Sequence, residues 1–189
     1  MREKIINTSI SLFGERGFRE TSIQDITNAL GVTKGTYYYY FTNKVDVLMH
    51  IHLRFIDGLL EQQETILNNT TTSNQEKLYD IVGMIIRNIK SGAQSARVFF
   101  REMRHLSDEH LAKVLPKRDQ FQRNVQDVIE QGMETGEFRK DLRTDMLSFA
   151  VLGVANWSYF WYEPDGEVTE EELTDIYMTM IFEGIKMEK

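Results

Sequence analysis

Apolar residues recur every three or four positions along most of this chain, which is the spacing of amphipathic helices. Ile6, Ile10 and Phe13 follow it near the start, and Leu173 and Ile176 follow it near the end. Runs that alternate apolar and polar residues, as half-buried strands do, are absent from the sequence. The pattern predicts an all-α protein with helices at about 2–16, 21–30, 33–41, 43–67, 73–92, 93–105, 107–133, 144–162 and 169–185.

Local signals set the expected ends of these helices. Thr21 is followed three residues later by Gln24, the spacing of a capping box, and Gly31 can adopt the left-handed conformation that stops a helix. Gly92 is expected to end another helix, and Pro116 is expected to break or kink the helix around it. Further capping pairs are Asn43 with Asp46, Ser73 with Glu76, and Thr169 with Glu172.

Residues 21–41 are predicted to form a short helix, a tight turn and a second short helix, the layout of a helix-turn-helix that reads the major groove of DNA. In the second helix, Lys34 supplies a cation, Gly35 lets the backbone approach closely, and Thr36 offers a hydroxyl and a methyl group. The expected DNA-binding residues are Thr21, Ser22, Thr33, Lys34, Gly35, Thr36, Tyr38, Tyr39, Tyr40 and Lys44.

Four consecutive tyrosines, at positions 37–40, lie in this second helix. At helical spacing Val32, Tyr37 and Phe41 are expected to face the core. A helix this short cannot bury all four tyrosines, so some must face outward, where a phenol hydroxyl can donate to a phosphate. The alternative, that all of them are core residues, leaves no account of the neighbouring Lys34.

Lys44 lies in the first turn of the helix expected from residue 43. Anions, and not cations, are favoured at a helix N-terminus. A DNA phosphate would supply the missing anion, so we expect Lys44 to contact the DNA backbone.

The first 50 residues or so resemble the TetR family of bacterial one-component transcriptional regulators. The resemblance implies a three-helix DNA-binding head, a helical body that binds a small ligand, and a fourth helix that transmits the ligand signal. The chain departs from the family pattern at Thr27, where alanine is usual, and at Tyr40, where histidine is frequent. The matching residues are Ile6, Ser9, Leu12, Phe13, Gly17, Phe18, Thr21, Ser22, Ile23, Asp25, Ile26, Ala29, Leu30, Gly31, Val32, Lys34 to Phe41, Asn43 and Lys44.

The net charge of −7 is unusual for a DNA-binding protein, but it is unevenly distributed. Residues 1–50 hold six Lys or Arg against five Asp or Glu, a net +1, and the remainder holds 16 against 24, a net −8. The acidic body would repel DNA and leave the N-terminal region as the contact surface. We therefore expect double-stranded DNA to be bound at a pseudo-palindromic operator by a dimer.

The chain of 189 residues contains no cysteine, which is typical of a cytoplasmic protein and excludes thiolate metal sites. It contains no apolar run of about 18 residues, so no membrane span or membrane partner is expected. The first residues lack the apolar segment of a signal peptide. We expect a cytoplasmic protein divided into a DNA-binding domain at 1–43 and a ligand-binding and dimerisation domain at 44–189.

The helix expected at 144–162 is apolar almost all round, and the last helix has a wide apolar face. Such helices must be covered on several sides. We expect these last two helices to form a homodimer interface with a second copy of the chain. An ordinary core face within a monomer is the alternative.

Residues 136–185 resemble the TetR subgroup that controls fatty-acid and related acyl or sterol degradation, through the Asn156-Trp157 pair and the later Trp161-Tyr162. The resemblance implies a repressor released by an acyl-CoA thioester. A drug-like lipophilic cation that induces an efflux gene is the rival effector, with Glu102, Glu130 and Glu134 as candidate partners. The expected lipophilic pocket residues are Phe99, Met103, Phe121, Val125, Trp157, Phe160 and Trp161, and the cations available for CoA are Arg97, Arg101, Arg104, Lys117, Arg118 and Arg123.

An enzyme is not expected. Glu102 and His105 form one half of a di-iron helix-bundle motif, but a second copy is absent from the sequence. No phosphate-binding glycine loop or nucleophile motif is present, so no catalytic residue, metal or cofactor is expected. A helical protein-interaction module without a role on DNA is the remaining alternative, and it leaves the polar surface of residues 34–40 unexplained.

Overall fold

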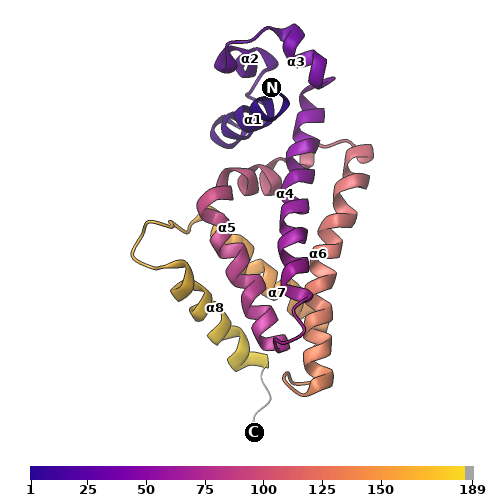
Figure 1. The fold of residues 1–189 in the computed structure, drawn as a ribbon, viewed down its shortest axis with the longest axis vertical. Coiled ribbons are helices and arrows are strands. Elements are labelled where there is room, and N and C mark those ends of the chain that lie inside the picture. Colours follow the sequence, from indigo (N-terminus) through magenta and orange to yellow (C-terminus); the bar gives the residue numbers. More distant parts are fainter. Residues whose placement is uncertain (186–189) are drawn as a thin grey trace. The chain divides into compact units, whose positions relative to one another are not determined.

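The computed structural model describes residues 1–185, and within them the regular secondary structure is helical, with no strand (Figure 1). The all-α prediction is therefore confirmed. The α-helices are α1 (Arg2–Arg16), α2 (Ile23–Leu30), α3 (Lys34–Tyr40), α4 (Lys44–Leu67), α5 (Asn74–Glu102), α6 (Asp108–Thr135), α7 (Thr144–Trp157) and α8 (Glu170–Ile185), and two short 3-10 helices are η1 (Met103–His105) and η2 (Ser158–Phe160).

Most helix ends follow the capping signals of the sequence. Asn43 accepts a hydrogen bond from the backbone of Asp46 at 2.9 Å, and Ser73 and Glu76 complete a capping box at the start of α5. Gly136 has a φ of 80° directly after α6, a conformation that glycine adopts without strain. The connection between α4 and α5 falls between the helices predicted at 43–67 and 73–92.

The helix end predicted at Gly92 is wrong, no break occurs at Pro116, and the helix expected at 144–162 ends at Trp157 and is followed by η2. Helix α5 continues through Gly92, because the residues on either side, such as Ile89 and Ala96, are buried and packing outweighs the weak helix propensity of glycine. Helix α6 continues through Pro116. Pro116 has no backbone N–H to donate to the carbonyl of Ala112, four residues earlier. Both residues are exposed, so water can donate to this carbonyl instead.

The chain forms two compact units. The first comprises Met1–Asp57 and Gln94–Pro116, and the second comprises Gly58–Ala93 and the chain from Lys117 onward. The predicted division at residue 43 coincides with the start of α4 and remains a prediction of how function is distributed.

The first unit has a core built from the inward faces of α1 to α4. Ile6, Phe13, Ile26, Tyr37 and Leu48 are buried there. Helix α1 packs on α2, and α2 packs on α3. The core of the second unit contains Leu78, Ile81, Ile85, Val125, Ile129 and Phe138.

Candidate nucleic-acid interface

Helix α2 begins one residue later than the sequence indicated. Ser22, and not Thr21, is the N-cap: its hydroxyl accepts from the Asp25 backbone at 3.1 Å, and the Asp25 carboxylate accepts from the Ser22 backbone at 2.7 Å. The Ser22 hydroxyl also donates to this carboxylate, and this hydrogen bond, followed by the one from the Ser22 backbone, holds the pKa of Asp25 below its usual range. Thr21 is fully buried, and its hydroxyl donates to the carbonyl of Gly17 at 2.9 Å. The expected capping pair of Thr21 with Gln24 is therefore wrong, and the Thr21 hydroxyl is occupied inside the protein.

The turn between α2 and α3 depends on Gly31. Its φ of 65° and ψ of 33° are left-handed, as the sequence predicted. The backbone of Gly31 donates to Asn28, and the backbone of Val32 donates to Thr27 at 3.0 Å. These bonds satisfy the last carbonyls of α2 and direct the chain into α3.

The N-terminus of α3 presents a small polar surface. Thr33 caps the helix by accepting from the Thr36 backbone at 3.2 Å, and the two threonine hydroxyls lie 3.1 Å apart. Lys34 and Gly35 are exposed, and Lys34 forms no ion pair within residues 1–185. An exposed cation, a side-chain-free backbone and two hydroxyls at a helix N-terminus suit a phosphate or a base edge.

The tyrosines divide between core and surface. Tyr37 is fully buried and donates to the carbonyl of Asn43 at 3.2 Å, while Tyr38 is 53% exposed and Tyr39 is 82% exposed. Tyr40 is half-buried, and its ring meets that of Tyr39 edge to face at 4.9 Å. Phe41 is buried and Val32 is half-buried. The predicted division between inward and outward aromatic residues is confirmed.

Lys44 has a different environment from the one expected. Its ammonium donates to the carbonyls of Phe18 and Thr21, both at 2.6 Å, and lies 4.3 Å from the centroid of the Phe18 ring. Burial lowers the pKa of Lys44. The anion that we assigned to a DNA phosphate is thus replaced by two carbonyl dipoles of the α1–α2 connection, and Lys44 stabilises the fold of the head.

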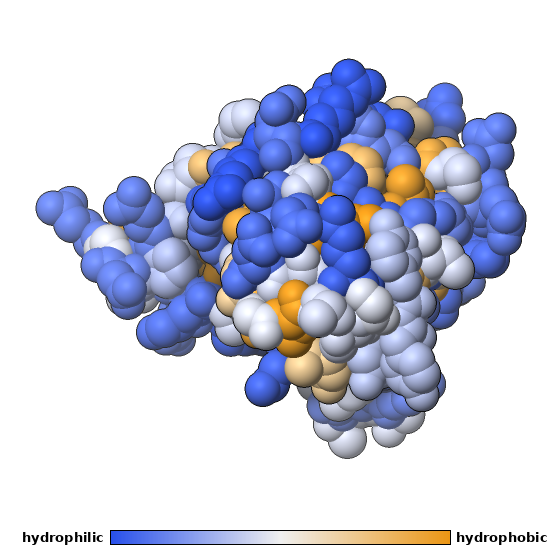
Figure 2. Space-filling view, turned by 90° about the horizontal axis from the view of Figure 1, so that it is seen from above, coloured by the Kyte–Doolittle hydropathy of each residue, from blue (hydrophilic) through white to orange (hydrophobic). Residues whose placement is uncertain are grey.

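Figure 2 views the molecule from above the orientation of Figure 1, the end at which α2 and α3 are drawn. Hydrophilic residues predominate on this face, and hydrophobic residues appear in scattered patches.

The residues expected to bind a lipophilic effector are distributed over both units. Phe99 and Met103 belong to the first unit, and Phe99 is buried with its ring 4.9 Å from that of Phe55. In the second unit Phe121 and Val125 are buried. Trp157, Phe160 and Trp161 are substantially exposed, and Trp161 lines a surface pocket with Tyr162 and Val168. Within each unit described alone, these residues do not form one site.

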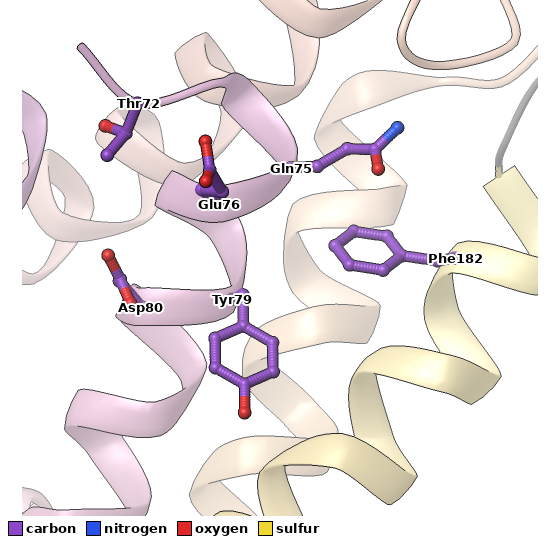
Figure 3. A pocket seen from close by; sticks show the side chains of 6 residues that line it. All are labelled: Thr72, Gln75, Glu76, Tyr79, Asp80 and Phe182. Carbon is purple, nitrogen blue, oxygen red and sulfur yellow. The ribbon is translucent and has the colours of Figure 1, made fainter. Parts of the chain in front are cut away.

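A second surface pocket in the second unit has a volume of about 330 Å³ and lies between the start of α5 and α8. Figure 3 shows Phe182 extending from α8 toward Gln75 on α5, with Tyr79 below them. Tyr79 donates to Asp175 at 2.6 Å, which raises the pKa of Tyr79 to about 12. The lining residues are Thr72, Gln75, Glu76, Tyr79, Asp80 and Phe182, none of which the sequence analysis assigned to a pocket.

The Glu102 and His105 side chains contact each other inside the first unit. The His105 Nε2 atom lies 3.4 Å from a Glu102 oxygen, and both side chains are largely buried. No group of three or more potential metal ligands occurs within residues 1–185. No helix in the described chain is long and apolar enough to cross a membrane.

Comparison with known proteins identifies the class. A family model described as bacterial regulatory proteins of the tetR family matches residues 5–51, and a model described as a tetracyclin repressor-like C-terminal domain matches residues 71–185. The chain belongs to the TetR family. It is a ligand-responsive, DNA-binding transcriptional regulator with a helix-turn-helix, as the resemblance of its sequence indicated.

Three similar proteins illustrate this membership. The HTH-type transcriptional repressor KstR2 of Mycolicibacterium smegmatis is 26% identical over 185 residues, which cover 97% of this chain and 90% of KstR2. The structure of the ketosteroid transcriptional regulator KstR2 of Mycobacterium tuberculosis is 25% identical with a TM-score of 0.88, covering 99% of this chain and 95% of that one. AibR in complex with isovaleryl coenzyme A and operator DNA is 24% identical with a TM-score of 0.87, covering 96% and 97%, a likeness of fold.

Proposed function

We propose that this protein is a homodimeric transcriptional repressor that leaves a pseudo-palindromic operator when it binds a lipophilic acyl-CoA thioester. The observation that carries the DNA-binding part is the surface of α3. Tyr37 fixes the helix to the core, so that Lys34, Tyr38 and Tyr39 project outward from a rigid element. Two such helices in successive major grooves would each place these side chains against phosphates and base edges.

The DNA contacts that we propose are Ser22, Thr33, Lys34, Gly35, Thr36, Tyr38, Tyr39 and Tyr40. Ser22 and Gly35 are exposed, and the Gly35 backbone can donate to a phosphate. The Ser22 backbone and hydroxyl both donate to the Asp25 carboxylate, so a Ser22 contact with DNA would replace one of these hydrogen bonds. Thr21 and Lys44 would support DNA binding indirectly, because their polar atoms form hydrogen bonds that hold the connection before α2.

The homodimer would form through α7 and α8. Large apolar side chains remain more than half exposed on these helices, among them Phe149 at 58%, Trp157 at 64% and Ile176 at 58%. Exposed apolar residues gathered on two adjacent helices mark an association surface. Sedimentation should give a dimer for the wild type and a monomer for Phe149→Asp, with helix content retained and operator affinity lost. A monomeric wild type that still binds the operator tightly would contradict this part.

Two features support an acyl-CoA thioester as the effector. Arg101 and Arg104, at the end of α5 and in η1, are exposed and form no ion pair with the described residues, so they are available to CoA phosphates. The fold is also able to hold such a ligand, since AibR has been solved with isovaleryl coenzyme A and operator DNA.

A lipophilic cation is the second candidate effector, and the pocket of Figure 3 favours it. Glu76 and Asp80 contribute carboxylates, and Tyr79 and Phe182 contribute aromatic rings that can face a cation. An organic cation such as tetraphenylphosphonium has the matching chemistry.

The test is fluorescence anisotropy of the protein on labelled DNA from upstream of its own gene, titrated in parallel with palmitoyl-CoA, free CoA and tetraphenylphosphonium. Release by palmitoyl-CoA at near-equimolar concentration, with free CoA inactive, is the expected result. Release by the phosphonium alone would select the second candidate. Binding that none of these ligands weakens would contradict both effector assignments.

A further inference from the structure

The connection between α1 and α2, residues 17–22, controls where the helix-turn-helix begins. Ser22 caps α2 at one end of this connection, and Gly17 follows α1 at the other with a φ of 94°. A displacement of the connection would therefore move the start of α2, and with it the helix pair that carries the DNA-binding surface.

Phe18 anchors the connection. Its side chain is only 7% exposed, and its ring meets that of Phe13 edge to face at 5.2 Å. The His105 imidazole stacks on the same ring, with centroids 5.2 Å apart and an interplanar angle of 22°. Lys44 approaches the ring from α4, with its ammonium 4.3 Å from the ring centroid. The ammonium donates to the carbonyls of Phe18 and Thr21 at 2.6 Å and to that of Arg19 at 3.5 Å.

Glu102 lies behind this arrangement. The residue is only 4% exposed, and its Oε2 atom lies 3.4 Å from His105 Nε2. A Cβ built on Gly17 would lie 3.9 Å from its other oxygen, so the carboxylate sits beside the start of the connection. A buried carboxylate persists only with polar partners, and here it fixes the orientation of the imidazole that stacks on Phe18.

We propose that His105 and Glu102 are positioning residues for operator binding, which hold Phe18 and thereby the start of α2 in the geometry that reads DNA. The inference rests on the proposed function, because its effect is expressed as operator affinity. Neither residue lies on the surface of α3, so their contribution passes through the connection and not through contact with DNA.

The arrangement is sensitive to the charge of His105. Glu102 on α5, Arg104 on η1, Arg19 in the connection and Lys44 on α4 are the charged groups that face the imidazole. Burial and then Arg19 lower the pKa of His105, and Glu102 opposes them. The neutral ring therefore stacks on Phe18 at neutral pH. Protonation would add a cation beside three others, so acidification weakens the support of the connection.

The experiment compares operator affinity and its pH profile in four proteins: wild type, His105→Ala, His105→Phe and Glu102→Gln. His105→Ala removes the ring and should weaken binding at least fivefold at pH 7.5 with unchanged helix content. His105→Phe keeps an aromatic ring and should stay within about twofold of the wild type. Between pH 7.5 and pH 5.5 the operator affinity of His105→Phe should fall less than that of the wild type, because phenylalanine cannot be protonated.

His110→Gln is the matched control, because it removes a histidine from the same unit without touching Phe18 and should keep the wild-type profile. If His105→Ala does not fold, His105→Gln, which keeps a polar side chain but not the ring, takes its place with the same expectation. Wild-type affinity and pH profile in both His105→Ala (or Gln) and Glu102→Gln would overturn the inference. Failure of the wild type to bind the operator would instead overturn the proposed function.

Discussion

Tyr37 and Tyr38 are adjacent in the chain and their rings meet edge to face with centroids 5.7 Å apart, yet Tyr37 is fully buried and Tyr38 is 53% exposed. The pair marks the line along α3 at which the core of the head ends and its outer surface begins. Substitutions on the two sides of this line should therefore have different consequences.

On the outer side, Tyr38→Phe and Tyr39→Phe should each weaken operator binding, because each removes a hydroxyl that can donate to a phosphate. A hydrogen bond to a charged group is worth roughly 1.5–3 kcal/mol, so a loss of about tenfold is expected for whichever hydroxyl makes the contact. Anisotropy titration measures the affinity, and thermal unfolding should show an unchanged melting temperature.

Tyr37→Phe is the control from the inner side. It removes the hydrogen bond to Asn43 and should lower the free energy of unfolding by about 1 kcal/mol. Affinity per folded molecule should remain that of the wild type. Equal affinities for all three variants and the wild type would show that α3 does not use its outer tyrosines.

Substitution of Lys34 and of Lys44 should have different effects on the salt dependence of operator binding. Lys34→Ala removes an exposed cation, so the slope of log affinity against log salt should fall by about one per protomer. Lys44→Ala should leave that slope unchanged. It should lower the free energy of unfolding by about 2 kcal/mol, since charged hydrogen bonds to two carbonyls are lost. Urea unfolding and anisotropy at several salt concentrations make the comparison. A lower slope for Lys44→Ala, with an unchanged slope for Lys34→Ala, would show that Lys44 contacts the DNA backbone.

His52 should make the protein sensitive to acid. It is fully buried, with ring nitrogens 2.8 Å from the Leu48 carbonyl and 3.2 Å from the Phe99 carbonyl. Burial lowers its pKa below the value of about 6.5 expected in the unfolded chain. The unfolded state therefore binds more protons as the pH falls, so the stabilising contribution is complete above pH 6.5 and is lost below it.

Urea unfolding at pH 7.5, 6.0 and 5.0 measures this loss. Because burial also lowers the pKa of His50 and His105, the His52→Gln variant should reduce the pH dependence without abolishing it. A wild-type free energy of unfolding that rises on acidification would contradict the assignment.

Two helical glycines should respond oppositely to alanine. A Cβ at Gly132 would collide with the ring of Phe138, which is fully buried, so Gly132→Ala should cost about 2 kcal/mol or more of unfolding free energy. A Cβ at Gly92 would meet no atom within 4 Å. Gly92→Ala should therefore stabilise the protein by up to about 1 kcal/mol, the difference in helix propensity. Denaturant midpoints report both, and destabilisation at Gly92 would show that α5 needs flexibility there.

Much of the fold follows from local chemistry that the sequence displays. The period of the apolar residues, the Ser73 and Glu76 capping box and the left-handed Gly31 act within a few residues, so the sequence predicted them. The predicted helix end at Gly92 and a break at Pro116 do not occur, because packing and solvent access, which depend on distant residues, decide whether a helix continues through them.

In the candidate site, too, the sequence predicted the local features and missed those that depend on distant residues. The exposure of Tyr38 and Tyr39 followed from helical geometry alone. The partners of Lys44 lie 23 and 26 residues earlier in the chain, and a helix-dipole argument that considers only its own helix cannot find them. The spacing of Glu102 and His105 was noted only as half of a di-iron motif, and the contact of His105 with Phe18 could not be found because it depends on tertiary structure.

The most direct test of the account is a side-by-side selection of genomic DNA fragments by the immobilised wild type and by a Lys34→Ala, Tyr38→Phe double variant, read by sequencing. We expect the wild type to enrich a small set of fragments that share a pseudo-palindrome, and the folded double variant to lose that enrichment. Equal enrichment by both proteins would contradict the role of α3, and no enrichment by the wild type would contradict the function as a DNA-binding regulator.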